Sequence, residues 1–167
     1  MTLGAIISMS HSFPKIMKKL HSLLAAVLLM PVIANAQYDF GDHRSETLLG
    51  KAWAAQDAKN DEAILVYTGK LIELFTPQAI EQQKALTAPL TVKEEVFKQW
   101  ALNDVATAYF VRGQALERQG KPQEAIEAYK FLVANLPFGQ CWDTKGWFWK
   151  PADGAAGRIK ALEFDAQ

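Results

Sequence analysis

Residues 103–137 constrain the fold more than any other stretch, because they contain two helical patterns joined by a short turn. Apolar and small residues recur at intervals of three and four on both sides of Gln119-Gly120-Lys121-Pro122. Gly120 permits the left-handed conformation that ends a helix, and Pro122 suits the first turn of the next helix, where its missing N–H needs no partner. The sequence therefore predicts an antiparallel pair of helices here.

This pair resembles the tetratricopeptide repeat, a helical hairpin of about 34 residues with small residues where its helices cross and an aromatic residue in each helix. The matching residues, in a single register, are Tyr109, Gly113, Gly120, Ala125, Tyr129 and Pro137. Arg112 and Leu116 depart from the pattern, standing where the family usually has a leucine and a second aromatic residue. We expect Gly113 and Ala125 to let the helices approach closely.

A weaker copy of the pattern lies upstream. Ala63 and Tyr67 have the spacing of Ala125 and Tyr129, and they follow a first helix expected over 45–56, capped by Ser45 or Asp42. Either residue of the pair Gly50-Lys51 fits the small position. The two alanines are less than two repeat lengths apart, so the sequence predicts about two repeats that do not form a regular array.

Helical patterns also fill the chain between the two repeats. Thr76-Pro77 is expected to start a short helix that ends before Pro89-Leu90, and residues 91–94 have the form of a capping box. From Val92 the pattern continues into the second repeat. We therefore predict an elongated first helix for that repeat, with a bend near Asn103-Asp104 as an alternative.

Residues 137–150 contain three of the five tryptophans and two glycines, a content that does not suit a regular helix or strand throughout. A final helix is expected over 152–164, after Pro151, and Ile159 and Leu162 would face the repeat as a C-terminal cap. The aromatic residues of 137–150 either join this cap or form an exposed stacking platform for a sugar or a partner protein. The platform residues are Trp142, Trp147 and Trp149.

Residues 1–36 have the organisation of a secretory signal peptide. From Met17, the expected true start with Met9 as the alternative, two lysines precede an apolar run over 23–30 and then Ala34-Asn35-Ala36. The run is shorter than the roughly 20 residues that span a bilayer, so no membrane insertion is expected after cleavage. We expect cleavage after Ala36, a periplasmic or secreted location, and one helical domain over 37–167.

Charge and chemistry narrow the class of function. All 18 acidic residues lie in 37–167, whereas three of the 18 basic residues leave with the signal, so the exported chain has a net charge of about −3. This charge argues against nucleic acids and anionic membranes as partners. The single cysteine, Cys141, is expected to be buried, with a free or intermolecularly paired thiol as alternatives.

We expect no enzyme activity, cofactor or metal. His43 is the only histidine in 37–167, which excludes a zinc site built from several histidines or cysteines. Asp39, Asp42 and His43 lack the spacing of metal ligands, and Cys141 with His43 has no local signature of a nucleophile pair. The sequence contains no glycine-rich phosphate loop.

The resemblance implies a protein-protein interaction module or scaffold that holds a peptide or partner protein on the concave surface formed by the first helix of each hairpin. In the register set by Gly113, the inward-facing residues are Thr107, Phe110, Gln114, Glu117 and Arg118. The weaker repeat adds Ser45, Leu48, Ala52 and Gln56.

Three alternatives stay open. The inward-facing residues would be solvated or covered by residues 76–90 instead of a partner, or the protein would bind carbohydrate or cell wall through 142–149. With about two repeats, the chain lies near the lower limit of independent stability, which makes a homodimer an alternative to a monomer.

Overall fold

The computed structural model describes residues 38–165, so the predicted signal peptide lies outside the described part of the chain. Its elements are the helices α1 (Ser45–Asp57), α2 (Asp61–Lys84), α3 (Lys93–Lys98), α4 (Trp100–Arg118), α5 (Pro122–Asn135) and α6 (Pro151–Asp165), and the strands β1 (Cys141–Asp143) and β2 (Trp147–Trp149). The predicted all-α fold is thus confirmed, with one small sheet added. None of the helices in 38–165 combines the length and the apolar character that crossing a membrane requires.

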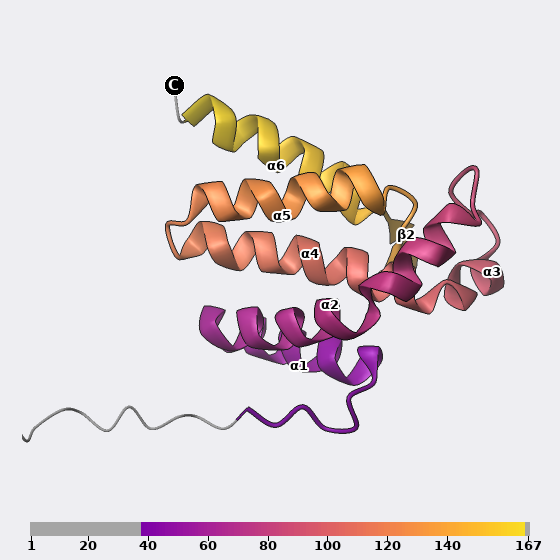
Figure 1. The fold of residues 1–167 in the computed structure, drawn as a ribbon, viewed down its shortest axis with the longest axis horizontal. Coiled ribbons are helices and arrows are strands. Elements are labelled where there is room, and N and C mark those ends of the chain that lie inside the picture. Colours follow the sequence, from indigo (N-terminus) through magenta and orange to yellow (C-terminus); the bar gives the residue numbers. More distant parts are fainter. Residues whose placement is uncertain (1–37, 166–167) are drawn as a thin grey trace, which may run out of the picture. The chain divides into compact units, whose positions relative to one another are not determined.

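The helices form a stack of antiparallel neighbours with α4 at its centre (Figure 1). α1 packs on α2, α2 on α4, α4 on α5 and α5 on α6. Core residues of α4 such as Leu102, Val105 and Leu116 are almost completely buried. Each buried leucine contributes about 1.5 to 3 kcal/mol, so α4 supplies much of the stability.

The predicted turn between α4 and α5 is observed. Gly120 has a φ of +70°, and Lys121 N–H donates to the carbonyl of Leu116 at 2.9 Å, which is the Schellman arrangement that ends a helix. Pro122 is the first residue of α5. Gly113 makes room for a ring rather than for a backbone, because a Cβ at this position would lie 2.3 Å from the ring of Tyr129.

The predicted elongated helix is wrong, because α3 and α4 are separated by Gln99 with φ −88° and ψ 40°. The side-chain amide of Gln82 occupies the break. Its Oε1 accepts from Leu102 N–H at 2.8 Å, and its Nε2 lies 3.4 Å from the carbonyl oxygen of Lys98. These two backbone groups would bond to each other in a continuous helix. A side chain of α2 therefore takes the place of one helical hydrogen bond.

The predicted helix start at Thr76-Pro77 is also wrong, since α2 continues through Pro77 to Lys84. Thr76 Oγ1 donates to the carbonyl of Ile72 at 2.6 Å, and Ala79 beyond the proline is fully buried. Figure 1 shows α2 changing direction along its length, as an internal proline causes. Tertiary packing thus keeps the helix intact at the cost of a bend.

The predicted N-caps of α1 and α3 are not observed, because neither helix has a side-chain hydrogen bond at its N-cap. Ser45 instead donates its hydroxyl to a side chain of α4. The structure does show a side-chain cap at the start of α2, where Asn60 Oδ1 accepts from Ala63 N–H at 3.0 Å.

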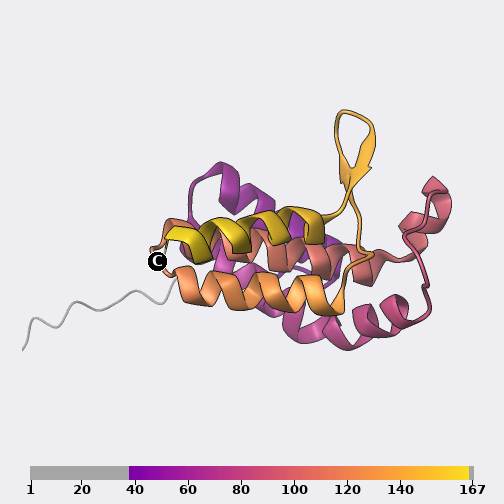
Figure 2. The same cartoon turned by 90° about the horizontal axis from the view of Figure 1, so that it is seen from above.

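The tryptophan-rich segment forms a β-hairpin that the sequence analysis did not predict. Cys141 pairs with Trp149 and Asp143 with Trp147, around a turn in which Gly146 has a φ of +103°. Figure 2 shows the hairpin projecting from the helices between the end of α5 and the start of α6. The final helix is confirmed, and Ile159 and Leu162 pack against the core.

Candidate binding groove

Three adjoining pockets form a groove, called here the aromatic groove, along α1, the N-terminal half of α4 and the β-hairpin. The carboxylate pocket, of about 300 Å³, is lined by His43, Arg44, Ser45, Glu46, Phe75, Trp100 and Asp104. The middle pocket, of about 260 Å³, shares Trp100 and Asp104 with it. The hairpin pocket, of about 400 Å³, shares Trp53, Cys141 and Trp142 with the middle pocket.

One face of α4 provides the floor of the groove. Trp100, Asp104 and Thr107 are spaced by four and three residues, which places them on the same side of the helix. Trp100 stands at the first position of α4 because Gln99 interrupts the preceding helix, and 39% of its surface is exposed. The break between α3 and α4 therefore determines where the indole lies.

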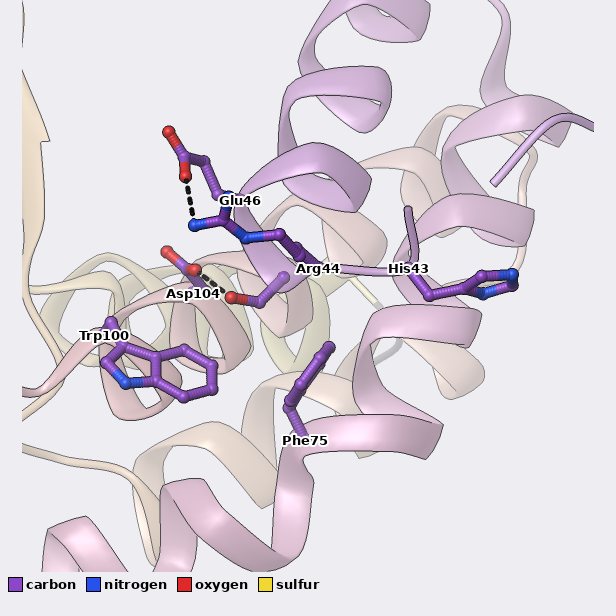
Figure 3. A pocket seen from close by; sticks show the side chains of 7 residues that line it. His43, Arg44, Glu46, Phe75, Trp100 and Asp104 are labelled. Atoms are coloured by element: carbon purple, nitrogen blue, oxygen red, sulfur yellow. Dashed lines mark hydrogen bonds and ion pairs between the residues drawn. The ribbon is translucent and has the colours of Figure 1, made fainter. Parts of the chain in front are cut away.

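The carboxylate pocket joins two aromatic rings to one carboxyl group (Figure 3). The centroids of Phe75 and Trp100 are 5.6 Å apart in an edge-to-face arrangement, and Figure 3 shows both rings below Asp104. Ser45 Oγ donates to Asp104 Oδ2 at 2.6 Å. This bond links α1 to α4 across 59 positions of the sequence.

Burial raises the pKa of Asp104 to about 6, while the bond from Ser45 acts in the opposite direction and the charge of Glu46 adds to the rise. Within residues 38–165, no lysine, arginine or histidine forms an ion pair with Asp104. Arg44, which also lines the pocket, pairs with Glu46 at 3.5 Å. Asp104 is thus a largely buried carboxyl group without a counter-charge.

The middle pocket has aromatic walls and a polar base. Its rings include Phe97 and Phe148, whose centroids are 5.5 Å apart. The base is held by Asn103, whose Oδ1 accepts from Gln140 N–H at 2.9 Å and whose Nδ2 donates to the carbonyl of Val96 at 2.7 Å. Because one side chain bonds to segments on both sides, the shape of this pocket is set before any ligand binds.

Of the five residues predicted on α4, only Thr107 lines the groove, and it is 1% exposed with its hydroxyl donating to the carbonyl of Asn103 at 2.8 Å. Phe110 lies under the hairpin and α6, with its centroid 5.2 Å from that of Trp149. A Cβ on Gly154 of α6 would lie 2.9 Å from the ring of Phe110.

The other three predicted α4 residues lie farther along the helix. Gln114 is half-buried. Glu117 accepts from the hydroxyl of Tyr129 at 2.6 Å and forms an ion pair with Arg158 of α6. Arg118 pairs with Asp61 of α2 at 2.7 Å. The structure therefore does not bring the five residues together in one open groove, and α6, not residues 76–90, lies against Phe110 and Glu117.

On α1 the groove lies one residue away from the predicted positions. Ser45 lines it as expected, but Leu49 and Trp53 follow, in place of Leu48 and Ala52. Those two residues are fully buried in the core. Gln56 is half-buried, and its Oε1 has no hydrogen-bond partner in the described structure.

The three predicted stacking residues have different surroundings. Trp149 packs on Phe110 and lines the hairpin pocket. Trp142 lines two pockets and is 38% exposed, with Lys93 Nζ 4.2 Å from its ring centroid. Trp147 is exposed and lines none of the three pockets. The hairpin therefore combines a packed indole with two accessible ones.

Sequence reasoning missed Trp53, Trp100 and Asp104. Extending the face of Thr107 toward the N-terminus of α4, by three and then four more positions, reaches Asp104 and Trp100, so the helical spacing contained this signal. Nothing comparable pointed to the hairpin except the turn-forming Asp143-Thr144-Lys145-Gly146 between aromatic residues.

The groups considered for catalysis are dispersed. Cys141, expected to be buried, is only half-buried; its partial burial raises the pKa of its thiol, which disfavours the reactive thiolate. His43 lies at the mouth of the carboxylate pocket with a φ of +60°. Within 38–165, no three His, Cys, Asp or Glu side chains are grouped as metal ligands.

No protein-family model, curated protein or solved structure matches this chain.

Proposed function

We propose that this protein is an exported, non-catalytic interaction module that binds an extended peptide, or a segment of a partner protein, in the aromatic groove. One observation carries the proposal: accessible aromatic side chains from α1, α3, α4 and the hairpin line a single groove with a few fixed polar groups. Recognition sites are typically concave and mostly apolar, with a small number of placed polar groups.

The exposed aromatic rings support a macromolecular ligand. Phe97, Trp100 and Trp142 are 48%, 39% and 38% exposed although they lie side by side around the groove. Clustered aromatic surface of this kind is typical of the anchoring residues of protein interfaces. The rigid base formed by Asn103 reduces the ordering that a ligand must cause, which favours binding.

We also propose that α1–α2 and α4–α5 are two repeats of the tetratricopeptide type. Tyr129 covers Gly113, and 62 positions earlier Tyr67 has Lys51 beside its ring, with the ammonium 5.9 Å from the centroid. Equal offsets for both members of each pair support a common hairpin geometry and favour Lys51 over Gly50 at the small position.

The test is a capture experiment from envelope extract with the purified protein. A Trp100→Ala/Trp142→Ala variant removes two groove rings, and Phe164→Ala, which removes a 75% exposed ring from α6, is the matched control. We expect the wild type and the control to retain a partner that the double variant loses by tenfold or more. Circular dichroism of the three proteins checks that each is folded before capture. Equal retention by all three would place the interaction outside the groove.

Carbohydrate binding is the second candidate, favoured by the accessible indoles of Trp142 and Trp147 on one projecting hairpin. Indole faces stack on sugar rings through the same apolar contact that serves protein interfaces. Co-sedimentation with purified cell-wall sacculi tests it: a Trp147→Ala variant would lose binding and Trp100→Ala would keep it. No sedimentation of the wild type would leave the peptide groove as the remaining proposal.

A further inference from the structure

We propose that the carboxylate pocket binds the basic side chain, lysine or arginine, of a peptide that occupies the aromatic groove. The inference rests on the proposed function and specifies the chemistry of its ligand. Asp104 would supply the negative charge, and Phe75 and Trp100 would contact the aliphatic stem and the cation.

Asp104 has hydrogen-bonding capacity that the fold does not use. A carboxylate accepts up to about four hydrogen bonds, and Ser45 is the sole donor to Asp104 among the residues that the structure describes. A largely buried carboxyl group without a counter-charge is costly to the fold, and a ligand cation removes that cost. The pocket of about 300 Å³ beside it leaves space for such a ligand.

Two walls of the carboxylate pocket are aromatic rings. Trp100 and Phe75 present ring surface next to the carboxyl group, and a cation is attracted electrostatically to the faces of such rings. Lysine and arginine carry a long apolar stem that packs on rings while the charged end reaches an acid. The walls and the acid therefore match the two parts of one side chain.

The charged residues that line the pocket are Arg44, Glu46 and Asp104. The basic group of Arg44 is paired with Glu46, which leaves Asp104 as the acid that faces the pocket without a cationic partner in 38–165. The carboxylates of Glu46 and Asp104 outnumber the one guanidinium, that of Arg44, which Glu46 already pairs. The electrostatic preference is thus for a cation.

The competing explanation is that Asp104 serves only to hold Ser45 and so join α1 to α4. Asparagine retains an acceptor for Ser45 but carries no charge. Asp104→Asn therefore separates the two explanations, because it preserves the link between the helices and removes the proposed attraction for a cation.

The probe is Nα-acetyl-lysine amide, compared with the uncharged Nα-acetyl-norleucine amide, which has the same stem. Binding is followed in the full chain by the NMR shifts of the Trp100 indole N–H and the Ser45 amide. We expect saturable shifts at millimolar lysine compound, at least fivefold weaker affinity for the norleucine compound, and loss of binding in Asp104→Asn. Asp57→Asn, which removes an exposed acid elsewhere on α1, is the matched control and should bind normally.

Lowering the pH from 7 to 5 should weaken the lysine compound's binding, because Asp104 gains a proton. The other titratable or charged residues that line the pocket are His43, Arg44 and Glu46, while Phe75 of α2 is uncharged and Cys141 of the hairpin is a thiol. The pH dependence of binding should persist in His43→Gln. In Asp104→Asn, any remaining binding should not depend on pH.

Equal affinity for the lysine and norleucine compounds, unchanged binding by Asp104→Asn, or no shift at about 10 mM lysine compound would each overturn the cation pocket. These outcomes differ from failure of the proposed function. Partner capture that depends on Trp100 and Trp142 without lysine binding would leave the groove proposal intact. Lysine binding without any captured partner would instead retain the pocket and remove the proposed interaction module.

Discussion

The two halves of α4 lie on one continuous helix and have opposite surroundings. The C-terminal half carries Phe110 and Glu117, which are covered by α6, the hairpin and Tyr129. The N-terminal half carries Trp100 and Asp104, which line an open groove. The same helix is thus scaffold at one end and candidate binding surface at the other, and neighbouring elements make the difference.

The carboxyl groups of Glu117 and Asp104 differ in the same way as the two halves of α4. Burial alone would raise the pKa of Glu117, but the hydrogen bonds from Arg158 and Tyr129 hold it below its usual value. Among residues 38–165, Asp104 accepts a hydrogen bond from Ser45 alone, and burial raises its pKa to about 6. The covered end of α4 pairs its carboxyl group with a basic side chain, whereas the carboxyl group at the open end has no basic partner among residues 38–165.

The largest expected effect tests the packing of the covered half. Gly113→Ala should lower the free energy of unfolding by about 3 kcal/mol, because the new methyl group would meet the fully buried ring of Tyr129. Urea denaturation followed by circular dichroism measures it. Gly157→Ala, where a Cβ meets nothing within 4 Å, should instead be neutral or stabilising by up to about 1 kcal/mol. Equal stability of the two variants would show that Tyr129 does not pack on Gly113.

The next prediction compares matched aromatic residues on the two halves. Phe110→Ala should cost about 2 to 3 kcal/mol, since it leaves a cavity between Tyr129, Trp149 and α6. Trp100→Ala should cost about 1 kcal/mol or less, because 39% of the indole is already exposed and its ring contact is with Phe75. Thermal and urea unfolding rank the pair. A larger loss for Trp100 would reverse the assignment of scaffold and binding surface.

Asp104→Asn should stabilise the protein by about 1 to 2 kcal/mol at pH 7. The pKa of this carboxyl group is higher in the folded state, about 6, than the ordinary value of 3.8, so the folded state binds more protons between these values. Wild-type stability therefore falls as the pH rises from about 4 to 6, and the advantage of the variant should disappear near pH 4. A variant less stable than wild type at pH 7 would mean that the charge of Asp104 supports the fold.

Glu117→Gln should cost about 1 kcal/mol at pH 7, because Arg158 and Tyr129 lose a charged partner. The lowered pKa gives the opposite sign to Asp104: the contribution is present above the unfolded value and is lost as the pH falls through the folded value. Unfolding from pH 7 to 3 measures this trend, with the exposed Glu124→Gln as control. An unchanged difference across that range would exclude the charge of Glu117 as its source.

Local features of the sequence predicted much of the helical framework. Gly120 and Pro122 fixed the turn, and Pro151 marked the start of α6. The errors arose where a distant side chain decides the backbone. Gln82 of α2 occupies the break between α3 and α4, and packing carries α2 through Pro77. Local sequence propensity cannot predict either of these tertiary contacts.

The candidate site was predictable only in part. The register of the repeat identified the face of α4 that carries Thr107, but it placed the binding surface around Phe110 and Glu117. Those side chains are covered by elements that follow more than twenty residues later, α6 among them. A pattern with a helical period selects a face, and it contains no information on how far along that face the next element lies.

The sequence by itself thus determined the all-α class, the hairpin of α4 and α5, its Gly120 turn and the C-terminal cap. The tertiary structure decided which half of α4 is open and brought Asp104 to Ser45, 59 positions away. The physical reason is that the interactions act over different distances along the chain. Helical periodicity and turn chemistry act over a few residues, whereas a groove arises from the relative placement of whole helices, set by the combined packing of many side chains.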